Sequence, residues 1–336
     1  MVYVSLGLRA IVNVEALNMV ESVGNVTRHR KASIVYKSDN RYVLRSVPVI
    51  SGECLAHAYQ WWIAELSKKR GLSLCQYCEQ GEFLKHSDLN FFGNKPWEQK
   101  LKNTISAKKN AYDPHEVEKA IVANCVVEDI GGFLYPGARP VKRTSRFQVG
   151  YMVPAFDAIE KSSLEPQFHV RHSPSLVAQK GAKIQPQMIY YVEVGSAVYT
   201  LSFNIDLSGI GYTSMIRVES AVSDGERAKR IDVALDSLAL MLDNKVFGAK
   251  LTRFNPVMDY DSVLVSVSEG FTFNVSPPAV ENYIEETVIR AEKYREIFGG
   301  RVTLLGYKTA HKNVRDFDTI IELFNEVKNL VKGAKK

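Results

Sequence analysis

The stretch Val47-Pro48-Val49-Ile50-Ser51-Gly52-Glu53-Cys54-Leu55-Ala56-His57-Ala58 predicts a buried strand that turns at Ser-Gly into an amphipathic helix. Apolar side chains in and after it recur at helical spacing, which places them on one face toward a core. This apolar set is Leu55, Ala58, Trp62, Ile63 and Leu66. Glu53, His57 and Gln60 recur at i, i+4 and i+7, so we expect a polar face opposite the core.

The start of this helix has two interpretations. Ser51 and Gly52 stand where a helix exposes its first backbone N–H groups, and these groups with the positive end of the helix dipole suit a phosphate. A Ser before a helix is equally an ordinary N-cap that serves only the fold. The segment alone leaves both interpretations open.

The remaining periodicity indicates an α+β fold with an antiparallel sheet. Strands are expected at residues 2–14, 30–37, 41–49, 189–194, 197–207 and 262–268, and helices at residues 51–66, after Asp113, and at residues 224–242. Without the hairpin at 30–49 and the insertions, the order strand, helix, strand, strand, helix, strand is that of a ferredoxin-like or RRM-like fold. Gly195 and Ser196 are expected to form a two-residue hairpin turn, and residues 262–268 the last strand.

Two polar segments interrupt this plan. Residues 67–138 carry little periodicity before the helix start at Asp113-Pro114-His115-Glu116, which predicts an inserted helical subdomain. Residues 166–187 are rich in Pro, His and Gln, too polar for a core and too long for a simple turn. We expect them to project as an arm that gives no strand to the sheet.

Composition sets broad limits. The chain has 336 residues, of which 46% are hydrophobic and 24% charged, so it can bury a sizeable core in one elaborated domain or two. No run of eighteen apolar residues is present, and the chain opens directly as a strand, so we expect a cytoplasmic protein without membrane contact. The four cysteines are irregularly spaced and do not form a disulfide framework.

The net charge of +6 is concentrated in two windows. Residues 28–45 hold six basic residues and one acidic residue, and residues 139–183 hold eight basic and three acidic residues. Both windows also contain aromatic and His side chains, which stack on nucleotides. Two basic segments on a slightly acidic body indicate a protein that follows a nucleic-acid backbone.

Several motifs, taken in order, resemble one known family. They are the strand at residues 2–14 followed by Glu15-Ala16-Leu17-Asn18, then Arg28-His29-Arg30-Lys31, the segment 48–57, Asp129-Ile130-Gly131-Gly132-Phe133-Leu134, and Arg139-Pro140-Val141-Lys142-Arg143-Thr144-Ser145. The set resembles the backbone subunit of archaeal type I-A CRISPR interference (Cascade) complexes, within the DevR-like autoregulator superfamily. The match covers most of residues 1–275 and is weakest at 67–128 and in the C-terminal tail.

The resemblance implies an architecture and a function. It implies an RRM-like palm at residues 1–66 and 190–275, helical fingers at 67–138, a projecting thumb hairpin at 155–188, and a C-terminal helical extension at 276–336 that packs on the palm. Similar proteins are non-enzymatic and polymerise along CRISPR RNA as a helical filament with other Cascade subunits. They present the guide for pairing with target DNA. No cofactor is implied.

The same resemblance, supported by charge in the two basic windows, gives a set of expected guide-RNA contacts. They are Asn18, Arg28, His29, Arg30, Lys31, Ser51, Gly52, His57, Gln60, Arg139, Lys142, Arg143, Arg171 and His172.

Cys75-Gln76-Tyr77-Cys78 has the spacing of a zinc knuckle, with His86 close enough in sequence to be a third ligand. A second CxxC is missing, so a local disulfide or two buried thiols compete with this interpretation.

Two further functions compete with guide binding. A metal-independent endoribonuclease would use His29, His57, His169 or His172 as acid or base at the 2′-OH, or an acid such as Glu15 or Glu21 after the first strand. A His beside Arg in a basic loop is more often a phosphate ligand. An RNA- or DNA-binding autoregulator is the third alternative.

Overall fold

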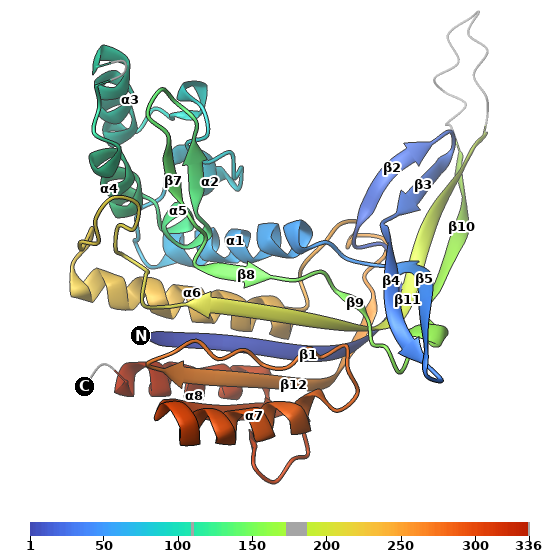
Figure 1. The fold of residues 1–336 in the computed structure, drawn as a ribbon. Coiled ribbons are helices and arrows are strands. Elements are labelled where there is room, and N and C mark those ends of the chain that lie inside the picture. Colours follow the sequence, from blue (N-terminus) through green and yellow to red (C-terminus); the bar gives the residue numbers. More distant parts are fainter. Residues whose placement is uncertain (109–110, 173–186, 335–336) are drawn as a thin grey trace, which may run out of the picture.

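A long antiparallel sheet forms the centre of the computed structural model, which describes residues 1–108, 111–172 and 187–334 (Figure 1). Its middle strand, β1 (Val2–Glu15), pairs on one side with β11 (Gln187–Asp206) and on the other with β12 (Val257–Glu269). Residues 3–10 are all buried, because both faces of this strand are covered. The predicted first strand is confirmed, with two covered faces instead of one.

Helices cover both faces of the sheet. On one face, α1 (Gly52–Lys69), α6 (Asp224–Asn244) and α8 (Ile320–Gly333) share an apolar core with the central strands. The other face is covered by α7 (Tyr283–Phe298), as Figure 1 shows. Within the described residues, no helix has the length and apolarity that a membrane span needs.

Tyr59 of α1 shows how the first layer is packed. Its buried ring lies edge-on against Phe147 and Phe203, with centroids 4.9 and 5.0 Å away. Its hydroxyl donates to the Ala234 carbonyl of α6 at 2.9 Å, which pairs the one polar atom of a buried ring. This single residue therefore ties α1 to the sheet and to the second helix of the layer.

The strand neighbours follow an alternating plan. The chain passes through β1, α1, β8 (Phe147–Val149), β11, α6 and β12. In the sheet the strands lie in the order β12, β1, β11, β8, all antiparallel, and β9 (Val153–Pro154) continues along β11. The two core helices thus connect strands of one sheet and lie together on one face.

The predicted hairpin turn at Gly195-Ser196 is wrong. The chain runs straight through these residues as one 20-residue strand, β11. A Cβ at Gly195 would lie 2.6 Å from Glu15 Oε1, so the glycine lets a buried carboxylate approach the backbone. A glycine in a strand therefore marks close packing at this position.

The C-terminal region contributes strands as well as helices. β13 (Arg301–Tyr307) pairs with β12, and β14 (Arg315–Asp316) pairs with β13. The expectations that residues 262–268 form the last strand and that 276–336 are only helical are therefore corrected. Val302 and Leu304 face α7, whereas Leu305 joins the core under α8, and burial on both sides hides the alternation of a strand.

Short helices form a lobe at one end of the sheet. They are α2 (Gln76–Gln80), the 3₁₀ turn at Leu89–Phe91, α3 (Pro96–Lys108), α4 (Pro114–Asn124) and α5 (Val126–Gly131), followed by the hairpin β6 (Phe133–Tyr135) and β7 (Val141–Arg143). Asp113 caps α4 through the His115 N–H, with Pro114 at the first helical position, as predicted. A separate apolar cluster holds this lobe together.

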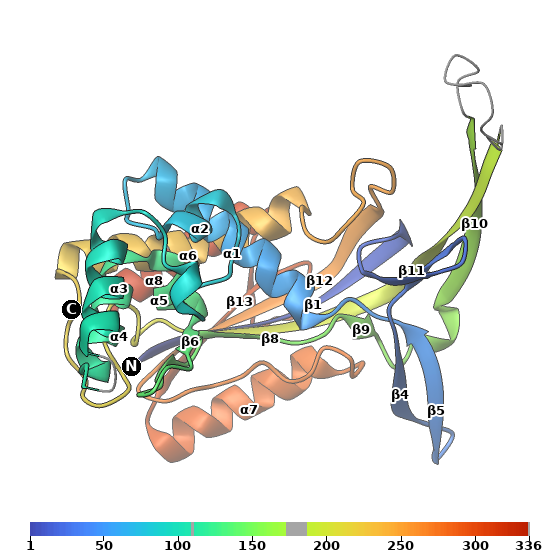
Figure 2. The same cartoon turned by 90° about the horizontal axis from the view of Figure 1, so that it is seen from above.

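Hairpins form a second lobe at the opposite end. They are built from β2 (Met19–Val23), β3 (Val26–His29), β4 (Lys31–Ser38), β5 (Arg41–Pro48) and β10 (Ser163–His172), with a 3₁₀ turn at Ile159–Lys161. The β4–β5 hairpin and the β10–β11 arm leave this end in different directions (Figure 2).

The arm differs from its prediction. β10 pairs with β11 from Ser163 opposite Ser196 to His172 opposite Gln187, so it does give a strand to the sheet. Polar residues suit this strand, because the arm stands away from the core. Residues 173–186, which include Lys180 and Lys183 of the expected thumb, lie outside the described residues.

Candidate nucleic-acid interface

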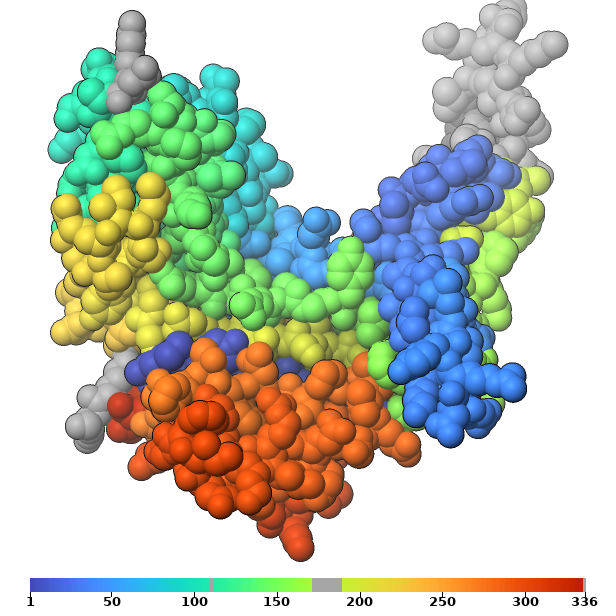
Figure 3. All heavy atoms as spheres, viewed as in Figure 1, coloured from blue at the N-terminus to red at the C-terminus, as the bar shows by residue number. Residues whose placement is uncertain are grey.

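The molecule is hollowed between the two lobes, and we call this surface the groove (Figure 3). The helical lobe forms one wall, and the lobe of β2, β3 and the β10–β11 arm forms the other. The exposed face of α1 and the segment from β8 to β9 form the floor. An extended polymer could lie in the groove against elements from both ends of the chain.

The start of α1 is not open to a phosphate as the sequence suggested. Ser51 and Gly52 are buried, and the Ser51 side chain accepts the Cys54 N–H at 3.3 Å as an N-cap. The Ser51 N–H donates to Asn18 Oδ1 at 2.8 Å, and a Cβ at Gly52 would meet the Val149 carbonyl at 2.8 Å. Asn18, Ser51 and Gly52 therefore build the floor of the groove, and the N-cap interpretation is the one that the structure supports.

The exposed face of α1 is rotated from the expected one. Glu53, His57 and Trp61 are exposed, whereas Gln60 is buried and its Nε2 donates to the Ala56 carbonyl at 3.0 Å. Gln60 lies against Gly131 at the end of α5, where a Cβ would be 2.5 Å from its Oε1. Packing of the helical lobe on α1 thus removes Gln60 from the polar face and leaves His57.

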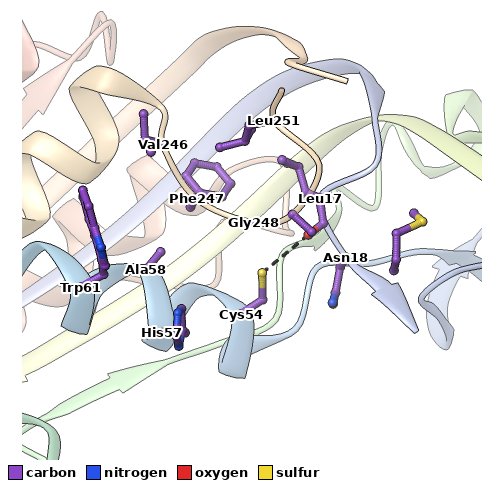
Figure 4. A pocket seen from close by; sticks show the side chains of 12 residues that line it. Leu17, Asn18, Cys54, His57, Ala58, Trp61, Val246, Phe247, Gly248 and Leu251 are labelled. Carbon is purple, nitrogen blue, oxygen red and sulfur yellow. Dashed lines mark hydrogen bonds between the residues drawn. The ribbon is translucent and has the colours of Figure 1, made fainter. Parts of the chain in front are cut away.

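An apolar pocket of about 420 Å³ opens beside the first turns of α1 (Figure 4). His57, Cys54 and Trp61 line it from the helix, and residues 246–251 line it from the loop between α6 and β12. Burial raises the pKa of the Cys54 thiol to about 11, so this group is neutral near neutral pH. The pocket accepts a flat or apolar group next to the groove.

His29 is not on the surface, which corrects its assignment as an RNA contact. Its Nε2 lies 2.6 Å from Glu15 Oε1, its Nδ1 lies 2.8 Å from the Arg30 carbonyl, and neither side chain of the His29–Glu15 pair is exposed. Glu15 also accepts hydrogen bonds of 2.7 Å from the Tyr199 hydroxyl and from the Leu17 N–H. The acid after the first strand is therefore a fully partnered structural group that substrate does not reach.

Arg143 is also buried, and its assignment as an RNA contact is corrected in the same way. Its guanidinium bonds to the Asp129 carboxylate and donates to the Tyr212 carbonyl at 2.6 Å. Arg230 of α6 reaches the other oxygen of Asp129 at 2.8 Å, and Glu118 lies 3.4 Å from Arg143. This ion cluster, made by α4, α5, α6 and β7, joins the helical lobe to the core layer.

The other expected contacts differ in exposure. Four basic side chains are exposed: Arg28, Lys31, Arg139 and Lys142. Arg30 is half-buried, and the Arg139 guanidinium donates to the Tyr112 carbonyl at 2.7 Å. Arg171 and His172 belong to β10, but their side chains lie outside what the structure describes.

Sequence reasoning missed a second basic site at the base of the arm. His169 stacks on Tyr190, with ring centroids 5.1 Å apart, and Phe254 lies edge-on to it. Lys250 and Arg253 line the same cavity, which has a volume of about 420 Å³. The signal in the sequence is two basic residues in the short loop before β12, and only the fold brings them to the arm.

Comparisons with known proteins agree with this architecture. Residues 6–288 match the family described as CRISPR-associated negative auto-regulator DevR/Csa2. Among curated relatives from Saccharolobus solfataricus, "CRISPR-associated aCascade subunit Cas7/Csa2 2" is 38% identical over 305 residues, 89% of each chain. "CRISPR-associated protein Cas7/Csa2 1" is 34% identical over 309 residues, 91% of this chain and 92% of the relative.

A solved chain of a "CRISPR RNA-guided surveillance complex, pre-nicking" covers 98% of this chain and 99% of its own length, with a TM-score of 0.57 and 10% identity. The fold is thus that of a chain found in a CRISPR effector assembly. The sequence matches then identify the chain as a member of the CRISPR-associated DevR/Csa2 family. The family resemblance predicted from the motifs is confirmed.

Proposed function

We propose that this chain is a non-catalytic, CRISPR RNA-binding backbone subunit of a type I-A Cascade complex. The observation that carries the proposal is the groove between the two lobes, in a chain that belongs to the DevR/Csa2 family over residues 6–288. The relatives are named as Cas7/Csa2 proteins, one of them as an aCascade subunit. The solved chain of similar fold comes from an RNA-guided complex.

In this proposal the sheet and its core helices are an RRM-like palm, at residues 1–66 and 190–275. The helical lobe is the fingers (67–138), and the arm belongs to the thumb (155–188). The strand order β12, β1, β11, β8 with α1 and α6 on one face supports the palm. Residues 276–336 pack on the palm through α7, α8 and β13.

Guide RNA would lie in the groove, held by phosphate contacts. Arg28 and Lys31 are exposed beside the hairpin wall, and Arg139 and Lys142 are exposed on the helical wall. Binding through such side chains carries little base preference and is strongly salt-dependent. The guide, held along its backbone, presents its bases to target DNA.

A filament of copies along the guide needs a surface between subunits. One face of the β4–β5 hairpin exposes Val35, Tyr42 and Leu44, which are 59%, 82% and 68% accessible. The opposite face packs Tyr36 on Ile159. We propose that this exposed apolar face meets a second copy or another Cascade subunit in the cytoplasm, because apolar side chains gathered on a projecting hairpin gain from burial.

The experiment compares two double variants on guide-length RNA at several salt concentrations. Arg28→Ala/Lys31→Ala removes two groove charges and is expected to lower the slope of log affinity against log salt by about 1.4, at roughly 0.7 per phosphate contact. The matched control Lys293→Ala/Arg301→Ala removes two exposed charges on α7 and β13, outside the groove, and is expected to leave the slope unchanged.

Two outcomes would count against the proposal. Equal slopes for the two double variants would separate the groove from RNA binding. Site-specific cleavage of end-labelled RNA by the purified chain would support an endoribonuclease, and tight binding to one DNA sequence in preference to RNA would support an autoregulator.

A further inference from the structure

Four side chains converge where the helical lobe meets α1. Cys75, Cys78, Cys125 and Glu128 each offer one ligand atom, and these atoms lie within 4.8 Å of one another. None of the four residues is more than 1% exposed. The first two cysteines flank the start of α2, and the other two residues flank the start of α5, so segments almost fifty residues apart along the chain meet here.

The spacing suits a tetrahedral metal ion. With metal–sulfur bonds of about 2.3 Å, the sulfur atoms of such a site are about 3.8 Å apart, so these side chains need only small movements. The turn is shaped like a knuckle: the Cys78 N–H donates to Cys75 Sγ at 3.4 Å, and Gly81 ends α2 with φ +83°. That glycine conformation lets the chain turn away directly behind the second cysteine.

The carboxylate of Glu128 is held in place from behind. Its Oε1 lies 2.7 Å from His86 Nδ1, and its Oε2 accepts the His86 N–H at 3.1 Å. His86 is fully buried, and its Nε2 lies 3.4 Å from Glu98 Oε1. His86 is therefore a positioning residue for the carboxylate, whereas Cys125 supplies the third sulfur, which the sequence alone did not reveal.

We propose that Cys75, Cys78, Cys125 and Glu128 bind one structural zinc ion. Three sulfurs favour zinc over the oxygen-seeking Mg²⁺ and Ca²⁺, and four protein ligands in a buried position leave no open place for substrate. Binding turns three thiols into thiolates and releases their protons to solvent, and no electron transfer is involved. The ion fixes α2 to α5 beneath the helical wall of the groove.

The test uses the full chain, purified under reducing conditions without chelator, with zinc measured per chain by mass spectrometry. One zinc per chain is expected. Cobalt(II) in place of zinc should give visible absorption of a tetrahedral site and a thiolate charge-transfer band. Cys125→Ser should lose the metal, and the control Cys54→Ser should keep it, because Cys54 lies beside α1 with its Sγ 3.7 Å from the Leu17 carbonyl.

A second variant probes the positioning role of His86. His86→Gln is expected to weaken zinc roughly tenfold to a hundredfold in competition with a colorimetric chelator, since outer partners of ligands have effects of this size. Its cobalt spectrum should keep the thiolate band, because the sulfur ligands remain.

Several results would overturn the proposal. A reduced wild-type chain that holds no zinc and takes up neither zinc nor cobalt has no such site. A disulfide between two of the three cysteines in non-reduced peptide mapping would assign them to a covalent link. Zinc loss in Cys54→Ser would place the metal elsewhere. If Cys125→Ser does not fold, the zinc content and cobalt spectrum of the wild-type chain still decide.

Discussion

The two lobes that border the groove use their basic residues in opposite ways. In the helical lobe, Arg143 turns inward to Asp129 and Glu118. In the hairpin lobe, Arg28 and Lys31 face outward, with acidic neighbours at 4.0 and 3.7 Å on the surface. Both lobes come from windows of similar charge in the sequence. Which basic residues remain for a ligand is decided by the carboxylates that the fold buries nearby.

The attachment of the lobes differs for the same reason. The helical lobe is held to α6 by charges that are completely buried, Arg230 and Asp129. The hairpin lobe is joined by continuous strands, with one buried acid, Glu15, at the junction. A buried charge with one partner removed is costly, whereas a surface ion pair contributes little. Substitutions at the two ends should therefore separate stability from binding.

The largest expected effect on stability is that of Arg143→Ala. It leaves Asp129 and Glu118 with one buried cation fewer, and breaking such a cluster costs about 3–5 kcal/mol of unfolding free energy. Urea denaturation measures the loss. The sequence neighbour Lys142→Ala is the control, expected within about 0.5 kcal/mol of wild type because Lys142 is exposed. Equal losses would contradict the contrast between inward and outward basic residues.

The next effect belongs to the hairpin lobe. His29→Gln takes the imidazole from the buried carboxylate of Glu15 and is expected to cost about 3 kcal/mol by the same measurement. His57→Gln, an exposed substitution on α1, should cost less than about 0.5 kcal/mol. Neither variant should change RNA cleavage, since none is expected. A stable His29→Gln chain would show that the pair is not what holds this junction.

A smaller effect should appear in acid. His115 and Lys119 of α4 hold the pKa of the Glu219 carboxyl at about 2, against an ordinary value of 4.5. This carboxylate stabilises the folded chain above pH 4.5, and its contribution is lost as the pH falls toward 2. The difference in melting temperature between wild type and Glu219→Gln should therefore shrink over this window. A constant difference from pH 7 to pH 2.5 would contradict the assignment.

The smallest effect on the free chain is expected at the β4–β5 hairpin. Tyr42→Ser/Leu44→Ser changes two exposed side chains and should alter unfolding free energy by at most about 1 kcal/mol. Electron microscopy with guide-length RNA should nevertheless show fewer ordered assemblies than wild type. Unchanged assemblies would remove this face from the proposed contact between subunits.

Local patterns predicted much of the fold. Helical spacing located α1 and α6, and Asp113-Pro114 marked the start of α4. The errors fall where tertiary packing replaces the local rule. Gly195 suggested a turn but admits a carboxylate, and β13 shows no alternation because apolar residues are buried on both sides.

The site was less accessible to sequence reasoning. Charge windows pointed to Arg28 and Lys31, which are exposed, but equally to Arg143, whose partners lie far away in the chain or behind the β6–β7 turn. Likewise, CxxC spacing suggested a metal, but Cys125 joins it only through the packing of α5. A pattern within a window cannot show which distant carboxylate or thiol will face it.

Strand β11 has a mechanical consequence. Its 20 residues reach roughly 65 Å at about 3.3 Å per residue, and its far half pairs with β10 while its near half is clamped between β1 and β8. The arm is thus a cantilever without a loop joint at its root. A load at the tip becomes a bending moment at Gly195, beside the Glu15–His29 pair, so stiffness there sets how far the tip can swing.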